Sequence, residues 1–331
     1  ITSDAGGLLL RELDKRYGLT AGFADSLSDR RHPSWVIHDL KTLVKQRLFS
    51  IALGYEDNND AQTLRSDPAV KTISGKLPET SEDLASPPTL CRFEDSVGRK
   101  DLRRLADCLF KLYVKAHPGA REVIVIDIDA TDDPTHGKQQ LSFFHGYYKQ
   151  YMYHPLFIVD GISGFPMACV LRAGNTHASH RIKAVLKRLV KKIKKAYPKA
   201  RILLRADAGF AVPRLYRFCE KRGISYTIGL ITNDRLKAKA ADLLEKAQQQ
   251  YDETKEKQRL FTSFNYRAES WSRYRRVVCK VEYTDKGANQ RFVVSNVLLK
   301  PQRLYDEIYV LRGDMENLSL IHISEPTRLR L

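Results

Sequence analysis

Hydrophobic residues in the first 120 positions of the chain recur every three or four residues. The clearest repeats fall in residues 8–54 and in Arg99–Ala116, where apolar side chains alternate with charged ones. Between them, prolines divide residues 61–100 into short pieces. Apolar residues at this spacing form one face of an amphipathic helix, and proline interrupts helices. The pattern predicts an all-α region over residues 1–120.

From residue 121 the pattern changes to short apolar runs. Glu122–Thr131 is rich in β-branched residues, which is typical of a strand buried on both faces. Further strands are predicted at 156–159, 167–171, 200–206 and 225–230, and helices at 178–197 and 213–222. The first three strands favour an antiparallel meander, and the later ones a βαβ unit. We therefore predict an α/β fold, a mixed sheet flanked by helices, over residues 121–232.

The last third of the chain alternates between the two patterns again. Residues 233–300 begin with a charged helix over 237–257 and continue with β-type alternation over 261–299. Residues 301–317 predict a further helix. Residues 318–331 contain Pro326 and do not continue the amphipathic pattern, so we expect them to be a non-native tail outside the fold.

The charge of the chain indicates a polyanionic partner. The formal net charge is +17, and nucleic acid is the commonest partner of such a basic protein. From Gly161 to Ala206 there are twelve Lys or Arg residues and no acid. One face of the predicted helix 178–197 carries Lys187, Lys191 and Lys195, which favours phosphate contact. The alternative is a basic face that only keeps the protein in solution.

Composition excludes several classes of protein. The five cysteines are far apart and form no C-x-x-C pair, so we expect neither a zinc ribbon nor a disulfide framework, and a reducing cytoplasm. No apolar run is long enough to span a membrane. The chain starts at Ile1 without an initiator Met, and we expect it to be truncated there.

Three acids at the ends of predicted elements are candidates for catalysis. Asp129 ends the first strand, Asp207 ends a later one, and Glu316 lies on the last helix. Carboxylates on several elements can hold two Mg²⁺ ions, the arrangement of two-metal phosphoryl chemistry. Asp127 precedes Asp129 by two residues, so both point to one face of the strand. The alternative is that these two cap the strand and pair with basic side chains.

Two other groups of residues could have a function. Arg273 and Arg275 alternate with Trp271 and Tyr274, which fits either a nucleic-acid surface or the outside of an antiparallel sheet. His177 and His180 are three apart, as in a metallohydrolase site. Without a clear third ligand, packing at a helix N-terminus or a phosphate contact explains these histidines better.

Several short motifs together resemble those of DDE transposases. Asp129-Ala130-Thr131 resembles the first catalytic motif, and the run Arg205–Phe210 resembles the second. Tyr309, Arg312 and Glu316 match the Y-x2-R-x3-E part of the signature of the insertion-sequence 4 supergroup. Four further segments are similar to bacterial transposases of insertion-sequence family 1380: Ser3–Gly7, Leu53–Asp57, Asn59–Ala61 and Asp127–Thr131.

This resemblance implies a ribonuclease-H-like core, in which residues 233–300 are an insertion and 301–317 the last core helix. It implies an N-terminal region, 1–120, for DNA binding or dimerisation. The implied activity is cleavage of double-stranded DNA at terminal inverted repeats and strand transfer into target DNA, with Mg²⁺, or Mn²⁺ in its place, and a homodimer in the DNA complex. Asp129, Asp207 and Glu316 would bind metal, with Asp127 as a further candidate ligand, while Tyr309 and Arg312 would contact DNA.

The chain departs from the signature at one position. The final Lys of the signature would fall at residue 323, which is Ile323. Together with the expected truncation at both ends, this predicts a copy that folds but transposes poorly. The alternative is a DNA-binding remnant of a transposase that does not cut.

Overall fold

The computed structural model describes residues 2–313. The chain divides into two compact units, Ile1–Pro118 and Gly119–Leu331. Within residues 2–313, no helix is long and apolar enough to cross a membrane.

Residues 2–118 form helices and no strand. The helices are α1 (Gly7–Tyr17), α2 (Leu19–Ser26), η1 (Pro33–Trp35), α3 (Leu40–Ala52), η2 (Asn58–Asp60), α4 (Ala61–Leu64), α5 (Pro68–Ile73), α6 (Pro87–Asp95) and α7 (Arg99–Ala116). Asp39 and Asp67 begin α3 and α5, where each carboxylate accepts from the backbone N–H three residues later and so satisfies a donor that the helix leaves unpaired. The all-α prediction for this region agrees with the structure.

A polar side chain fixes the interior of this unit. Gln46 is buried, and its amide exchanges two hydrogen bonds of 2.9 Å with the backbone of Ala85. Around it, buried Leu43 and Leu90 pack in one apolar cluster. The paired amide therefore joins α3 to the segment before α6 without leaving a buried polar group unsatisfied.

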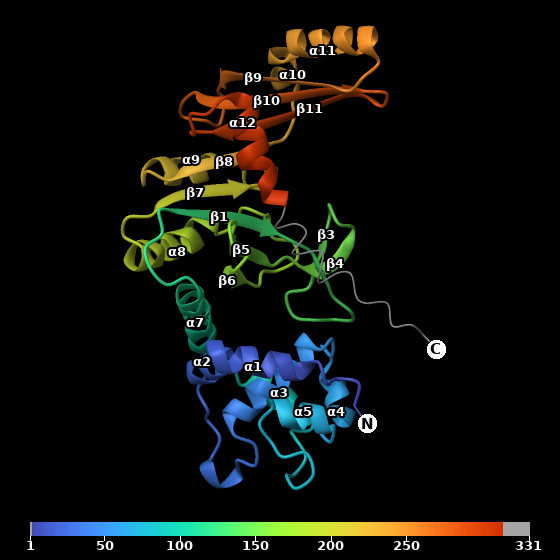
Figure 1. Ribbon diagram of the computed structural model, residues 1–331, viewed down its shortest axis with the longest axis vertical. Helices are drawn as coiled ribbons and strands as arrows, with labels where there is room; N and C mark the ends of the chain where they lie inside the picture. Colours follow the sequence, from blue (N-terminus) through green and yellow to red (C-terminus); the bar gives the residue numbers. More distant parts are fainter. Residues whose placement is uncertain (1, 314–331) are drawn as a thin grey trace. The chain divides into compact units, whose positions relative to one another are not determined.

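Within residues 119–313, eight strands form one mixed sheet in the order β6-β5-β1-β7-β8-β11-β10-β9 (Figure 1). These strands are β1 (Val123–Ala130), β5 (Leu156–Asp160), β6 (Pro166–Val170), β7 (Arg201–Ala206), β8 (Ser225–Leu230), β9 (Gln258–Tyr266), β10 (Arg275–Thr284) and β11 (Gly287–Ser295). β1 is antiparallel to β5 and parallel to β7. The α/β prediction is confirmed, and β1 is buried along most of its length.

Helices of this unit connect and cover the strands. They are α8 (Ile182–Ala196), η3 (Ala208–Phe210), α9 (Pro213–Glu220), α10 (Asp234–Lys239), α11 (Ala241–Thr254), α12 (Pro301–Arg303), η4 (Leu304–Tyr309) and η5 (Val310–Arg312). The charged helix predicted over 237–257 is two helices, because the backbone leaves the helical conformation at Ala240.

Strands of the C-terminal third extend the main sheet instead of forming a separate one. β11 pairs antiparallel with β8, with Phe292 opposite Leu230. The segment after residue 300 then packs back onto these strands, where Leu304 and Tyr305 meet Val278 and Val293 in an apolar cluster; Figure 1 shows α12 lying across β10 and β11. This return places η4 and η5 near the ends of the central strands.

A small second sheet follows β1 directly. Its strands are β2 (Asp133–Pro134), β3 (Phe143–His145) and β4 (Gln150–Tyr153), in the order β2-β4-β3. The sequence pattern does not predict this sheet, because strands of two to four residues are too short to show a period.

Candidate active site

Asp129 and Asp207 lie on adjacent strands at the same edge of the sheet. The parallel register pairs Asp127 with Arg205 and Ile128 with Ala206, so the next position places Asp129 beside Asp207. Asp207 keeps an extended backbone, and side chains two apart in a strand share a face. Neighbouring strands are roughly 4.8 Å apart, so the two carboxylates are neighbours on one face.

Local hydrogen bonds orient both carboxylates. Asp129 Oδ1 accepts from the N–H of Ala130 at 2.9 Å, and Asp207 Oδ1 accepts from the N–H of Gly209 at 3.0 Å. Asp207 is also the N-cap of the short helix η3. Each acid is half-buried.

Two positions before these acids, Arg205 of β7 faces Asp127 of β1. Arg205 donates from Nε to Asp127 Oδ1 at 2.6 Å and from Nη2 to Asp127 Oδ2 at 2.5 Å, and both residues are buried. Gly161 makes room for this pair, because a Cβ there would lie 2.5 Å from Arg205 Nη2 and from Asp127 Oδ2. Both oxygens of Asp127 are engaged by Arg205, so we leave Asp127 out of the candidate metal ligands.

The C-terminal helical segment reaches the same edge. Arg205 Nη1 donates to the carbonyl of Ile308 at 3.0 Å. A Cβ at Gly229 would lie 2.6 Å from the Tyr309 hydroxyl and 3.2 Å from the backbone N of Ala208, so this hydroxyl lies over Gly229 and beside the residue after Asp207. Tyr309 is therefore close to the carboxylate pair.

Arg312 lies on the same side. Its guanidinium is 5.7 Å from the ring centroid of Tyr309. Burial raises the pKa of Asp127, while the hydrogen bond and charge of Arg205 and the charge of Arg312 oppose that rise. Both signature residues that the structure describes thus approach the strand ends. Glu316, the third candidate acid, lies outside the described residues.

The charges of several acids affect the hydroxyl of Tyr148. The pKa of the Tyr148 hydroxyl is raised to about 12, chiefly by burial, and the negative charges of Asp132, Asp129 and Asp207 contribute to this rise. These charges make the surroundings of the Tyr148 hydroxyl negative. Tyr148 and Asp132 were not singled out in the sequence, where they stand in an aromatic stretch without periodicity and beside a turn.

The residues present fit a divalent cation in part. Neighbouring carboxylates repel each other and favour a cation between them, and carboxylate oxygens are the ligands that Mg²⁺ prefers. Within residues 2–313, no three His, Cys, Asp or Glu side chains gather closely enough for a complete metal site. His177 Nδ1 lies 3.0 Å from the Ser179 hydroxyl, a local contact of the segment before α8.

The basic helix has the two faces that the sequence predicts. In α8 the apolar side chains are buried, and Lys187, Lys191 and Lys195 are exposed. Among the side chains of residues 2–313, none forms an ion pair with any of these three lysines. Their charges therefore remain available to an external anion.

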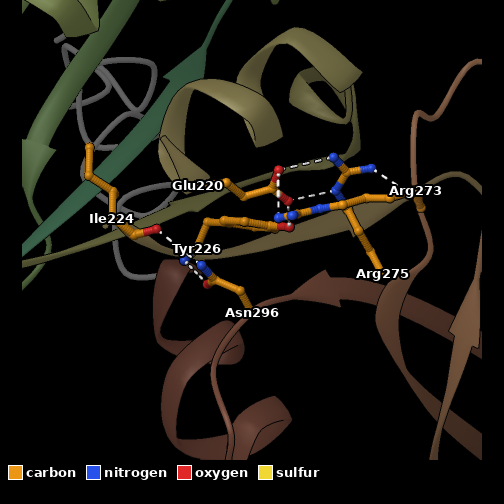
Figure 2. Close-up of polar contacts among 6 residues, drawn as sticks. All are labelled: Glu220, Ile224, Tyr226, Arg273, Arg275 and Asn296. Carbon is orange, nitrogen blue, oxygen red and sulfur yellow. Dashed lines mark hydrogen bonds and ion pairs between the residues drawn. The ribbon is translucent and has the colours of Figure 1, made fainter. Parts of the chain in front are cut away.

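Arg275 has a structural role that the sequence did not reveal. It is buried, and it donates to both oxygens of Glu220 at 2.8 and 3.1 Å. Figure 2 shows Glu220 receiving Arg275, Arg273 and the Tyr226 hydroxyl together. We therefore leave Arg275 out of the candidate DNA contacts. Arg273 stays a candidate, because its side chain is 60% exposed although it also pairs with Glu220.

This cluster ties α9 to the C-terminal strands. Asn296 accepts from the N–H of Tyr226 at 2.7 Å and donates to the carbonyl of Ile224 at 3.2 Å (Figure 2). Burial alone would raise the pKa of Glu220, but the hydrogen bonds from Arg275, Arg273 and Tyr226 lower it. The cluster joins β10 and the residue after β11 to α9 and to β8, the strand next to β7.

Comparison with known proteins points to one family. The family model described as transposase DDE domain group 1 matches residues 1–321. The cryo-EM structure of the piggyBac transposase synaptic complex with hairpin DNA is similar, with a TM-score of 0.44 and 13% identity, over 95% of this chain and 67% of that one. No curated protein matches the chain.

Proposed function

We propose, from the premise that this chain belongs to the group 1 DDE-domain transposases, that it cuts DNA at the inverted repeats ending a mobile element and joins those ends to target DNA. The observation that carries the proposal is the parallel register of β1 and β7, which puts Asp129 beside Asp207. Two acids from separate strands at one sheet edge are the start of a metal-dependent phosphoryl-transfer site. The narrower assignment to insertion-sequence family 1380 rests on the sequence motifs alone.

The strand order supports a ribonuclease-H-like core. Three antiparallel strands, β6-β5-β1, continue into two parallel ones, β7 and β8. In this proposal, residues 233–300 are the insertion between β8 and the last helix. The N-terminal unit would then bind DNA or a second copy of the chain.

We assign the metal to Asp129 and Asp207, with Glu316 as the third ligand on sequence grounds. Mg²⁺, or Mn²⁺ in its place, would supply Lewis-acid polarisation of the phosphate and a more acidic water when bound. The chain itself orients the acids: Ala130 and Gly209 donate to Asp129 and Asp207. Arg205 neutralises Asp127, so the buried charge beside the site is balanced.

Several cations are placed to hold the DNA. Arg312 and the Tyr309 hydroxyl lie at the strand ends, where a strand that reaches the two aspartates would pass. Lys187, Lys191 and Lys195 offer an exposed row of charge to phosphates. Arg273 is a further contact. A homodimer on paired DNA ends is part of the same proposal.

Replacing either aspartate tests the proposal. Asp129→Asn or Asp207→Asn in the full chain should abolish Mg²⁺-dependent nicking of a supercoiled plasmid that carries the DNA flanking the coding sequence. Affinity for the same DNA in EDTA should stay near that of the unchanged protein, because the amide keeps the side-chain shape. The matched control is Asp234→Asn, whose side chain is fully exposed at 101% and should leave nicking unchanged.

Two outcomes would decide against the proposal. Nicking that persists in Asp129→Asn and Asp207→Asn would remove both acids from the chemistry. Tight DNA binding without nicking by the unchanged protein, in Mg²⁺ and in Mn²⁺, would favour the DNA-binding remnant.

A further inference from the structure

The turn of the β3–β4 hairpin, residues 146–149, is an aromatic tip near the sheet edge that carries Asp129 and Asp207. The β3–β4 hairpin lies between β1, which ends one residue after Asp129, and β5, whose first residue Leu156 pairs with Ala130. Figure 1 shows the hairpin beyond the end of the β1 arrow. The hairpin therefore emerges from the sheet edge that carries the carboxylates.

Backbone and ring contacts within the hairpin hold its turn in place. Lys149 has a left-handed backbone (φ 55°), and its N–H donates to the carbonyl of His145 at 2.8 Å. The Tyr148 ring lies 5.0 Å from the ring of His145 and 6.1 Å from that of buried His154. His154 Nδ1 in turn lies 2.6 Å from the carbonyl oxygen of Thr176, and the carbonyl of the next residue, Pro155, accepts from the N–H of Thr131 at 3.3 Å. The base of the hairpin is thus tied to the segment that follows Asp129.

Tyr147 is the outermost part of this tip. Its side chain is 83% exposed, and its ring meets the Tyr148 ring edge-on at 5.1 Å. An exposed aromatic ring held by a second ring is a ready surface for a flat partner. Since the hairpin leaves the sheet at the end of β1, one residue after Asp129, that partner would lie at the sheet edge that carries the two carboxylates.

We propose that Tyr147, supported by Tyr148, stacks on an unpaired nucleobase of the DNA strand that reaches Asp129 and Asp207. This inference rests on the proposed function, because that function brings DNA to the carboxylates. A base is uncharged and flat, so the nearby acids do not repel it, and aromatic rings stack on any base. The charge within residues 146–149 is that of Lys149, which suits the phosphate next to such a base. An acidic protein partner would meet three carboxylates.

The test measures binding to single-stranded DNA in EDTA, where no cleavage takes place. The probes are oligodeoxythymidine, the same strand with one internal 2-aminopurine, and a duplex of equal length. Tyr147→Ala should weaken single-strand affinity about tenfold, the effect of losing one stacked base. It should leave duplex affinity and the slope of affinity against salt unchanged, because no phosphate contact is removed. The quenching of 2-aminopurine in the complex should be lost.

Two variants separate stacking from a general effect on the hairpin. Tyr147→Phe keeps the ring and should restore both affinity and quenching. Tyr151→Ala removes another exposed ring of the hairpin (62% exposed), which contacts Phe144 instead of Tyr148, and should behave as the unchanged protein.

Three results would overturn the inference: single-strand affinity that Tyr147→Ala leaves intact, an equal loss in Tyr151→Ala, or a change in oligomeric state without a change in DNA affinity, which would make the tip a contact between copies. The two proposals fail differently. A protein that stacks bases in EDTA but never nicks with Mg²⁺ contradicts the proposed function. One that nicks while Tyr147→Ala binds and nicks equally well contradicts this inference alone.

Discussion

Two pairs of neighbouring side chains on β1 and β7, which we call the inner and the outer row, differ in their charges. In the inner row Asp127 faces Arg205, and in the outer row Asp129 stands beside Asp207. The two rows lie two positions apart on one face, so their different side chains give them different roles. An anion and a cation make a closed, buried pair, whereas two anions leave a negative site at the sheet edge that favours a cation. The inner row is a structural ion pair, and the outer row holds the two candidate metal ligands.

The largest effect should follow from breaking the inner row. Arg205→Ala leaves the Asp127 carboxylate, 1% exposed, without its partner, which costs about 3–5 kcal/mol for a buried pair. Urea unfolding, followed by circular dichroism, measures the loss. The matched control is Arg303→Ala, which breaks an exposed pair with Glu307 and should cost under about 1 kcal/mol.

A double replacement keeps this prediction testable if Arg205→Ala fails to fold. Asp127→Leu with Arg205→Met removes both charges and should be much more stable than Arg205→Ala, because no buried charge is left unpaired. Equal losses in Arg205→Ala and Arg303→Ala would show that the inner row is not a structural pair.

A smaller effect should come from crowding the inner row without changing its charges. In Gly161→Ala the new methyl group would lie 2.5 Å from Arg205 Nη2 and Asp127 Oδ2, so the ion pair must shift. Overpacking of this kind costs about 1–3 kcal/mol, measured by the same urea unfolding. Gly146→Ala is the control, since no atom lies within 4 Å of its added Cβ. If both variants unfold alike, the pair tolerates displacement.

The elements of both rows could be predicted from the sequence, but their register could not. Apolar runs mark β1 and β7 because strand burial leaves a local trace, and Asp129 and Asp207 follow those runs directly. The pairing of Asp127 with Arg205 depends on residues 78 apart. One local signal was present: an acid and a base each stand two positions before the catalytic candidates.

Residues whose partners are distant were the ones misread or missed. Arg275 alternates with aromatics and resembles a surface residue, but Glu220, 55 residues earlier, holds it inside. Tyr148 gains its place from a hairpin whose strands are too short to show periodicity. Charge and apolar pattern thus predict the site's acids, while long-range contacts decide which neighbours support them.

The smallest effect should be the change in stability on replacing Asp129 in the outer row, and its sign should be opposite to that of the inner-row replacements. Asp129→Asn removes one of two neighbouring anions, and opposed like charges across strands destabilise by roughly 0.2–1 kcal/mol. We expect Asp129→Asn to be as stable in EDTA as the unchanged protein, or more stable by that amount. Added Mg²⁺ should raise the Tm of the unchanged protein, because a ligand that binds the folded state stabilises it, and should raise that of Asp129→Asn less. Asp234→Asn, changed at an exposed acid, should respond to Mg²⁺ as the unchanged protein does. A marked loss of stability in Asp129→Asn would mean that Asp129, like Asp127, is held in a structural pair, and the contrast between the rows would fail.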